Sequence, residues 1–469
     1  MKEIHRMTAA ELAEAYRAKR LSPVEALAAA VARAAAVQPR LNPFSFVRGE
    51  DAEAAARESE ARWMRGEPKG PLDGIPLAIK ENHAAKGWPK QSGSRTRDAA
   101  VDAEDAPHIA RLREAGMLLF ARTTMPDLGW KGVGDSPLTG VTRNPWNPAM
   151  TPGGSSGGAA VAVATGCCPI ATGGDGGGSI RMPAGFTGVF GIKPTSGRIP
   201  GLYDSPAGDL VAPGPLSRSV ADSAAALAAM CGADARDPAA SAVPVPDFPA
   251  LLGAGVRGLR VAVSATLGFT PRPDPVRMAA LEGAAAALAE AGATVAWTDP
   301  PLWNCRAAFA TIWEAAYALA VMTTPPERLG LFDPGLLAVG RRGLATSAVA
   351  EKLAQAERLR LMHAMIGFHR AHDLLLCPTL PIAAFAAGHG SNTPDERLWP
   401  EWYDWTPYTW TFNLTKQPCA SIPWGLDGAG LPVAVQLVAL HFREDLVLRG
   451  ASVLEAANPM PMPPDTAWS

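Results

Sequence analysis

The sequence predicts an α/β fold in which helices cover both faces of a β-sheet. Three segments join a helical pattern to a short apolar run, at residues 106–123, 276–298 and 350–379. Helices that alternate with strands buried on both sides are typical of such folds. With 469 residues, 48% of them hydrophobic and 19% charged, the chain can bury a large core, so it is not disordered, collagenous or coiled-coil. Length alone allows either one large α/β domain or several smaller ones.

Two helices are predicted at the amino terminus, at about residues 8–20 and 22–38. Thr8 and Ser22 each begin an S/T-x-x-E capping box, and Pro23 occupies a first helical position, where its missing N–H costs nothing. The apolar positions of both helices are mostly alanine, so we expect them to pack closely on something larger.

A buried strand is predicted next, within LDGIPLAIKEN at residues 72–82, an apolar run bounded by Gly74 and Asn82. Lys80 closes this run. A lysine in that position either extends to the surface or lies desolvated in a site, and the pattern leaves both interpretations open.

Residues 144–215 hold most of the glycine clustering and two serines in unusual settings. A long flexible loop is one interpretation, but a structureless loop of this size is uncommon and usually functional. Ser155 lies in TPGGSSGGAA, and Ser179 follows three glycines before a predicted helix. Free backbone N–H groups there would suit an oxyanion hole, although Ser179 could equally be an N-cap. GGSSG also satisfies the G-x-S-x-G elbow, but the proline-rich segment before it cannot supply the required strand.

Charge and targeting signals exclude several classes of protein. There are 43 basic and 45 acidic residues, with no basic run, so we expect no nucleic-acid partner. The amino terminus has no apolar signal region, and the uncharged stretch after Arg143 is too rich in proline and glycine to span a membrane, so a cytoplasmic protein is expected. Six cysteines form neither a disulfide framework nor a metal motif. No histidine lies near either serine in sequence, which leaves Lys80 as the alternative base.

Lys80, Ser155 and Ser179 lie in segments that resemble the amidase signature family of serine hydrolases. The matching segments are LDGIPLAIKEN, ARTTMPDLGW, TPGGSSGGAAVAVATG, GGDGGGSIRMPAGFTGVFGIKPTSGRIP and GPLSRSVAD. The resemblance implies a single domain over residues 1–469, with a signature core at about 72–220 and variable substrate-pocket insertions at about 300–350 and 385–415. The implied fold is an α/β/α sandwich around a twisted mixed sheet of about ten strands, with the active site at its edge.

The resemblance also implies a Ser-Ser-Lys triad. By position, Ser179 is the nucleophile, Ser155 the bridging serine and Lys80 the base, which must be uncharged to accept a proton. The implied oxyanion hole consists of Gly176, Gly177, Gly178 and the N–H of Ser179, and the Gly154–Ser155 peptide bond should be cis.

Some residues depart from the family pattern. Glu81 follows the lysine where aspartate is usual, and the segment ENHAAKGWP replaces a run of asparagine, apolar residues and aspartate. Gly174 and Gly176 flank Asp175 where threonine or another side chain is more usual. These differences bear on the loop shape and pocket access rather than on the triad.

The activity implied by the resemblance is cleavage of linear aryl or alkyl amides through an acyl-enzyme, with carbamates (urethanase activity) and esters as further substrates. Neither metal nor organic cofactor is needed. The alternative is a glutamine-hydrolysing amidotransferase subunit that works with partner chains, a function for which the aromatic variable region is poorly suited. Candidate pocket residues are Met125, Trp130, Trp402 and Trp405, although the aromatic residues among them could equally pack a core.

Overall fold

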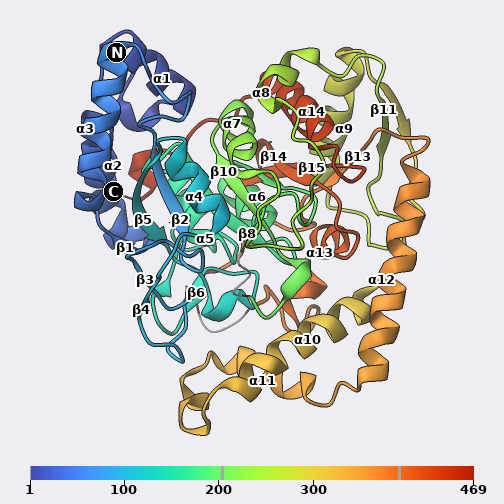
Figure 1. Ribbon diagram of the computed structural model, residues 1–469. Helices are drawn as coiled ribbons and strands as arrows, with labels where there is room; N and C mark the ends of the chain where they lie inside the picture. The colour runs from blue at the N-terminus through green and yellow to red at the C-terminus, as the bar shows by residue number, and fades with distance from the viewer. Residues whose placement is uncertain (1, 202–204, 389–391, 469) are drawn as a thin grey trace.

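The computed structural model describes residues 2–201, 205–388 and 392–468. Within these residues an eleven-stranded mixed sheet runs through the centre of the molecule (Figure 1). This arrangement confirms the predicted α/β fold. Across the sheet, the strands are β1 (Phe44–Val47), β5 (Leu118–Thr123), β2 (Pro76–Lys80), β8 (Ile170–Asp175), β10 (Ala212–Ser217), β9 (Phe190–Lys193), β14 (Cys419–Leu426), β15 (Pro432–Ala439), β13 (Leu374–Pro378), β11 (Arg260–Val263) and β12 (Thr294–Trp297). Separate two-stranded ribbons are formed by β3 (Pro89–Lys90) with β4 (Ala100–Val101), and by β6 (Asp135–Ser136) with β7 (Gly140–Val141).

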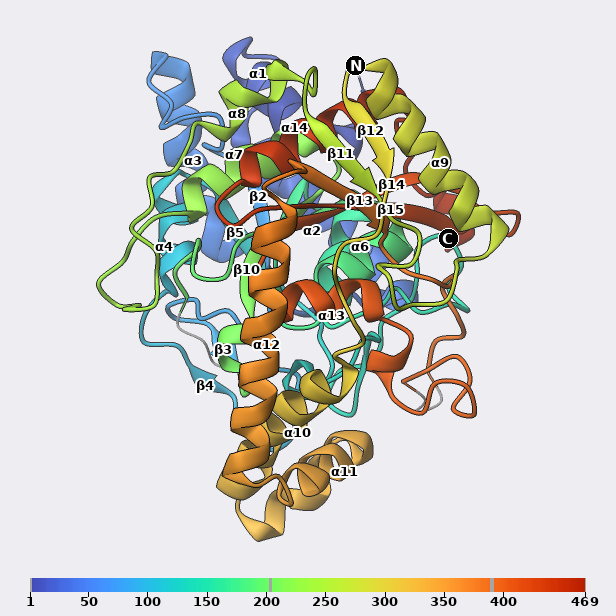
Figure 2. The ribbon, with the colours of Figure 1, turned by 90° about the vertical axis from the view of Figure 1, so that its right-hand side faces the viewer.

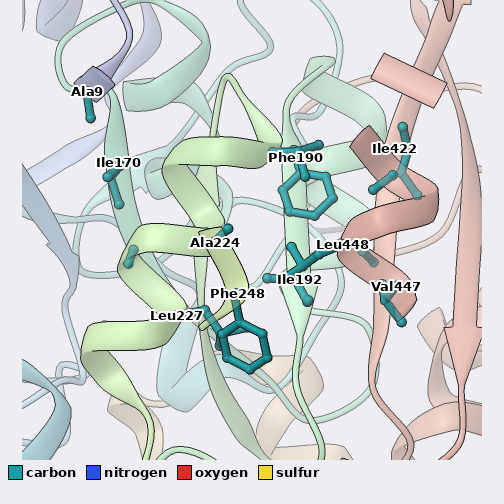
Figure 3. Close-up of a cluster of buried hydrophobic side chains, with 14 of the residues drawn as sticks. Ala9, Ile170, Phe190, Ile192, Ala224, Leu227, Phe248, Ile422, Val447 and Leu448 are labelled. Atoms are coloured by element: carbon teal, nitrogen blue, oxygen red, sulfur yellow. The ribbon is translucent and has the colours of Figure 1, made fainter. Parts of the chain in front are cut away.

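Helices cover both faces of this sheet (Figure 2). On one face, Phe190 and Ile192 of β9 lie between Leu227 of α7 and Leu448 of α14 (Figure 3). The opposite face packs against α2, α3 and α5. The helices are α1 (Ala9–Arg17), α2 (Pro23–Leu41), α3 (Glu50–Arg65), α4 (Pro107–Glu114), α5 (Gly157–Ala164), α6 (Arg181–Thr187), α7 (Val220–Met230), α8 (Phe248–Leu251), α9 (Pro275–Glu290), α10 (Arg306–Thr323), α11 (Pro334–Gly343), α12 (Ala348–Phe368), α13 (Pro407–Leu414) and α14 (Glu444–Ala457).

The strand that carries Lys80 is buried on both sides, which explains its unbroken apolar sequence. Leu77 and Ile79 of β2 join the cluster drawn in Figure 3, whereas Ala78 between them joins the cluster on the opposite face. β2 pairs in parallel with both β5 and β8. Since parallel neighbours end at the same edge of a sheet, Lys80 and Asp175 reach one edge together.

Most predicted elements are found within a few residues of their expected bounds. Thr8 and Ser22 both form complete capping boxes, ahead of α1 and α2. The three predicted helix-and-strand pairs are α4 with β5, α9 with β12, and α12 with β13. Residues 144–215 are not a flexible loop, because they contain α5, β8, α6, β9 and β10. Residues 144–152, all of them described, contain no strand, so the G-x-S-x-G elbow is absent as predicted.

Helices α10, α11 and the first half of α12 form an arm beside the sheet (Figure 2). α10 and α11 fall in the region expected to vary, at 300–350. Among the described residues, no helix combines the length and the apolar character needed to cross a bilayer.

Candidate active site

Lys80 turns its amine into the protein interior at the end of β2. The residue is only 2% exposed. Its Nζ donates hydrogen bonds to Ser155 Oγ at 2.8 Å and to the Gly174 carbonyl at 3.1 Å. Burial lowers the pKa of Lys80 to about 7, although the Asp175 carboxylate acts in the opposite direction. Of the two interpretations left open by the sequence, the structure therefore supports a desolvated lysine, and near neutral pH a large fraction of it is an uncharged amine.

Ser155 lies in the loop that leads into α5. The peptide bond between Gly154 and Ser155 is cis, as the resemblance implies. A Cβ on Gly154 would lie 2.3 Å from the Val133 carbonyl oxygen, so only glycine fits there. The next residue, Ser156, donates its N–H to the Ser179 carbonyl at 3.0 Å and thereby joins the two serine-bearing loops.

Ser179 follows β8, in the turn that precedes α6. The helix begins at Arg181 with Ile180 at the N-cap position, so Ser179 is not the capping residue. Ser179 is 4% exposed. In the described part of the chain no hydrogen bond joins the hydroxyl groups of Ser155 and Ser179. Catalytic hydrogen bonds are often long before substrate binds and shorten in the complex.

A buried ion pair fixes the shape of this turn. The Arg181 guanidinium binds both carboxylate oxygens of Asp175, at 2.9 and 3.0 Å, and neither side chain is exposed. Burial alone would raise the pKa of Asp175, but Arg181 holds it well below its ordinary value. Asn413 and Gln436 accept further hydrogen bonds from Arg181, at 2.6 and 2.8 Å. The carboxylate is therefore a fixed anchor rather than a proton donor.

Asp175 also changes the predicted oxyanion hole. Gly178 donates its N–H to Asp175 Oδ1 at 2.7 Å, so this N–H is not free for a substrate oxygen. This bond removes Gly178 from the predicted set of donors. The N–H groups of Gly176, Gly177 and Ser179 have no hydrogen-bond partner among the residues described. Gly178 instead supplies a backbone φ of +123°, and a Cβ there would lie 2.3 Å from Thr409 Oγ1.

Aromatic rings pack directly against this glycine turn. A Cβ on Gly177 would lie 2.5 Å from Trp402 and 3.1 Å from Phe309, and a Cβ on Gly176 would lie 3.3 Å from Trp313. Because no side chain intervenes, the rings contact the main chain beside Ser179. Val211 completes this apolar wall, 3.1 Å from the same position on Gly176.

The four predicted pocket residues are all buried but lie in different surroundings. A Cβ on Gly129 would lie 3.2 Å from both Met125 Cε and Ser155 Oγ, so Met125 flanks Ser155. Trp402 belongs to the apolar wall that packs against Gly176 and Gly177. Trp405 stacks on Phe186 with ring centres 6.0 Å apart, and Trp130 packs against Gly335, so both lie within the surrounding aromatic core.

The sequence alone does not identify several residues that shape the site. Asp175 and Arg181 were visible as an Asp and an Arg six positions apart within the glycine block, but Asn413 and Gln436 carry no sequence signal that links them to it. Within residues 2–201, 205–388 and 392–468, no three His, Cys, Asp or Glu side chains are grouped so that they could hold a metal ion.

Comparison with known proteins identifies relatives of this chain. The sequence model of the family described as Amidase matches residues 25–448. The chain is 33% identical to an acylamidase of Rhodococcus erythropolis over 97% of this chain and 96% of that protein. It is 34% identical to a glutamyl-tRNA(Gln) amidotransferase subunit from a Synechococcus strain, over 91% of this chain and 92% of that protein. The fold superimposes on a bacterial aryl acylamidase of the amidase signature family with a TM-score of 0.89, at 29% identity and 97% coverage of both chains.

Proposed function

The chain belongs to the amidase signature family, and from this premise we propose that it hydrolyses linear aryl or alkyl amides through an acyl-enzyme on Ser179. The observation that carries the proposal is the 2.8 Å hydrogen bond between Ser155 Oγ and the buried Nζ of Lys80. An uncharged lysine beside a serine hydroxyl is an arrangement that can withdraw a proton from a nucleophile. In this scheme Ser155 passes the proton of Ser179 to Lys80 as the Ser179 oxygen attacks the carbonyl carbon.

The oxyanion that forms is held by main-chain donors. The N–H groups of Gly176, Gly177 and Ser179 are assigned this role, because they have no partner among the described residues and lie in a turn that Asp175 and Arg181 hold rigid. The proton then returns through Ser155 to the departing nitrogen, which leaves as a neutral amine. In the second half of the reaction, water attacks the acyl carbon while its proton passes through Ser155 to Lys80. The proton then returns to the Ser179 oxygen as the acid is released. Carbamates and esters develop the same oxyanion, so both are included among the proposed substrates.

The surroundings of the turn favour an apolar acyl group over glutamine. Trp402, Phe309, Trp313 and Val211 approach Gly176 and Gly177, whereas Asp175 and Arg181, which hold the turn, are paired with each other. A glutamine substrate would need its own charged groups neutralised by such residues. The 34% identity to an amidotransferase subunit nevertheless makes glutamine hydrolysis the competing activity to test.

A substrate panel on the purified chain separates these activities. We expect the 4-nitroanilide of an aromatic acid to be hydrolysed with a kcat/KM at least about 100-fold above that for glutamine, since binding glutamine in an apolar pocket leaves its charged groups unpaired. A fluorophosphonate probe, followed by peptide mass mapping, should label Ser179. Efficient glutamine hydrolysis without anilide hydrolysis would favour the amidotransferase function, and a label on Ser155 instead would refute the assigned roles.

Trp402 is expected to control the size of the accepted acyl group. Trp402→Leu removes a ring that contacts Gly177, so the ratio of kcat/KM for bulky over small acyl anilides should rise by about tenfold. Trp424→Leu is the control, because this half-buried tryptophan of β14 packs on Gly283 of α9 and not on the glycine turn. An unchanged ratio in Trp402→Leu, with the variant folded, would assign this ring to the core alone.

A further inference from the structure

Two buried histidines lie beside Lys80. His83 follows β2 and is 7% exposed, and His108 projects from α4. Their rings meet edge to face with centres 4.6 Å apart. His83 lies in the segment ENHAAKGWP, and it is tied to Lys80 through the main chain, where its N–H donates to the Lys80 carbonyl at 2.9 Å.

The hydrogen bonds of this pair determine where its protons lie. His108 Nδ1 is 3.2 Å from the Pro200 carbonyl oxygen, which can only accept, so this nitrogen carries a proton. Burial lowers the pKa of His108 to about 4, so near neutral pH its other nitrogen, Nε2, is an acceptor. His108 Nε2 is 3.2 Å from His83 Nδ1, which therefore donates. The same Nδ1 is 2.9 Å from Thr172 Oγ1.

It follows that His83 Nε2 bears a free lone pair. Burial lowers the pKa of His83 well below its ordinary value, with smaller contributions from His108 and Lys80, so this nitrogen stays unprotonated. Nε2 has no hydrogen-bond partner among the residues that the structure describes. The Nε2 atom keeps contact with solvent, so a water molecule can bind it.

The position of this lone pair points to Lys80. A Cβ on Gly174 would lie 3.6 Å from His83 Nε2 and 4.0 Å from Lys80 Nζ, so both nitrogens border the space that a side chain at 174 would fill. Lys80 Nζ donates to two acceptors, Ser155 Oγ and the Gly174 carbonyl. An uncharged amine has only two N–H groups, but the ammonium has three. The third N–H of the ammonium has no acceptor in the described part of the chain.

We propose that His83 Nε2 accepts this third N–H through one water molecule while Lys80 holds the proton taken from Ser179. The inference rests on the proposed function and names His83 as a positioning residue of the base. Glycine at position 174 is part of this arrangement, because the absence of a side chain there leaves room between His83 Nε2 and Lys80 Nζ. His108 and the Pro200 carbonyl keep the imidazole in the tautomer that can accept.

Two substitutions separate this role from a structural one. Glutamine places its side-chain oxygen near the position of Nε2, whereas asparagine reaches only the position of Nδ1 and keeps the contact with Thr172. Loss of an acceptor for the ammonium lowers the pKa of Lys80, so in His83→Asn the acid limb of kcat/KM should move to lower pH by about 1 pH unit. His83→Gln should keep the wild-type limb. The other charged groups around the two side chains, Asp175, Arg122 and Lys90, are unchanged in both variants.

The reverse ranking, with His83→Gln shifted and His83→Asn unchanged, would show that His83 acts through Thr172 alone and would overturn the proposal. Nitrogen-15 spectra of histidine-labelled wild-type protein provide a readout independent of activity. We expect His83 as the Nδ1–H tautomer, and an Nε2–H tautomer would also overturn it. Probe labelling of Ser179 is measured in parallel, so that failure of the nucleophile assignment is distinguished from failure of the role of His83.

Discussion

Ser179→Ala is expected to abolish turnover of every substrate class, with kcat/KM reduced by about 10⁴-fold or more. Removing the hydroxyl oxygen leaves no atom that can form the acyl-enzyme, and no other serine hydroxyl of the turn can take its place. The fold should survive, because Ser179 contributes its main-chain carbonyl to Ser156, and alanine keeps that bond. Steady-state rates on an aryl anilide, together with loss of fluorophosphonate labelling, measure the effect.

A matched control is Ser217→Ala. Ser217 is a buried serine of β10 whose hydroxyl binds Ser223 and the Ser219 carbonyl, away from Lys80. This variant should keep its activity within about twofold and still take up the label. If Ser179→Ala retained more than a few per cent of the wild-type kcat/KM, the nucleophile would have to be another residue.

The sequence was sufficient for most of the helices and strands, and the proposed triad positions rest on the same kind of local signal. A lysine that ends an apolar run, and serines within glycine blocks, are visible without a structure. The anchor of the turn is not visible in this way, since Arg181 meets Asn413 and Gln436 more than 200 positions further along the chain. The engagement of Gly178 N–H by Asp175 depends on the same turn geometry and could not be read from spacing.

The aromatic residues show more clearly what the spacing of residues in the sequence cannot predict. Trp402 and Trp405 are three positions apart and both nearly inaccessible, yet one contacts Gly177 and the other stacks on Phe186. Trp402 begins a short 3₁₀ turn, Trp402–Asp404, and Trp405 follows the last residue of this turn. Their surroundings are therefore set by tertiary packing, for which sequence spacing carries no information.

Lys80→Met is expected to lower kcat/KM by about 10³-fold, which is within the range of a lost general base. Methionine fills a similar volume in an apolar site, so the variant should fold. The wild-type profile should fall tenfold per pH unit below about pH 7, because burial lowers the pKa of Lys80 to about 7 and only the uncharged amine accepts a proton. Lys80→Met should lose this acid limb. Lys80→Arg, which keeps a positive charge but cannot act as a base, should be as inactive as Lys80→Met.

The acid limb needs one further assignment, because burial also raises the pKa of the adjacent Glu81 to about 7. The Glu81 carboxylate accepts the N–H groups of Gln91 and Gly93, at 2.6 and 2.8 Å, and so serves the neighbouring loop rather than Ser155. Glu81→Gln removes this titration while leaving Lys80 in place. An acid limb that persists in Glu81→Gln and disappears in Lys80→Met belongs to the lysine, whereas the opposite pattern would remove Lys80 from the role of base. His83 and His108 do not confuse the assignment, since both have pKa values well below 7.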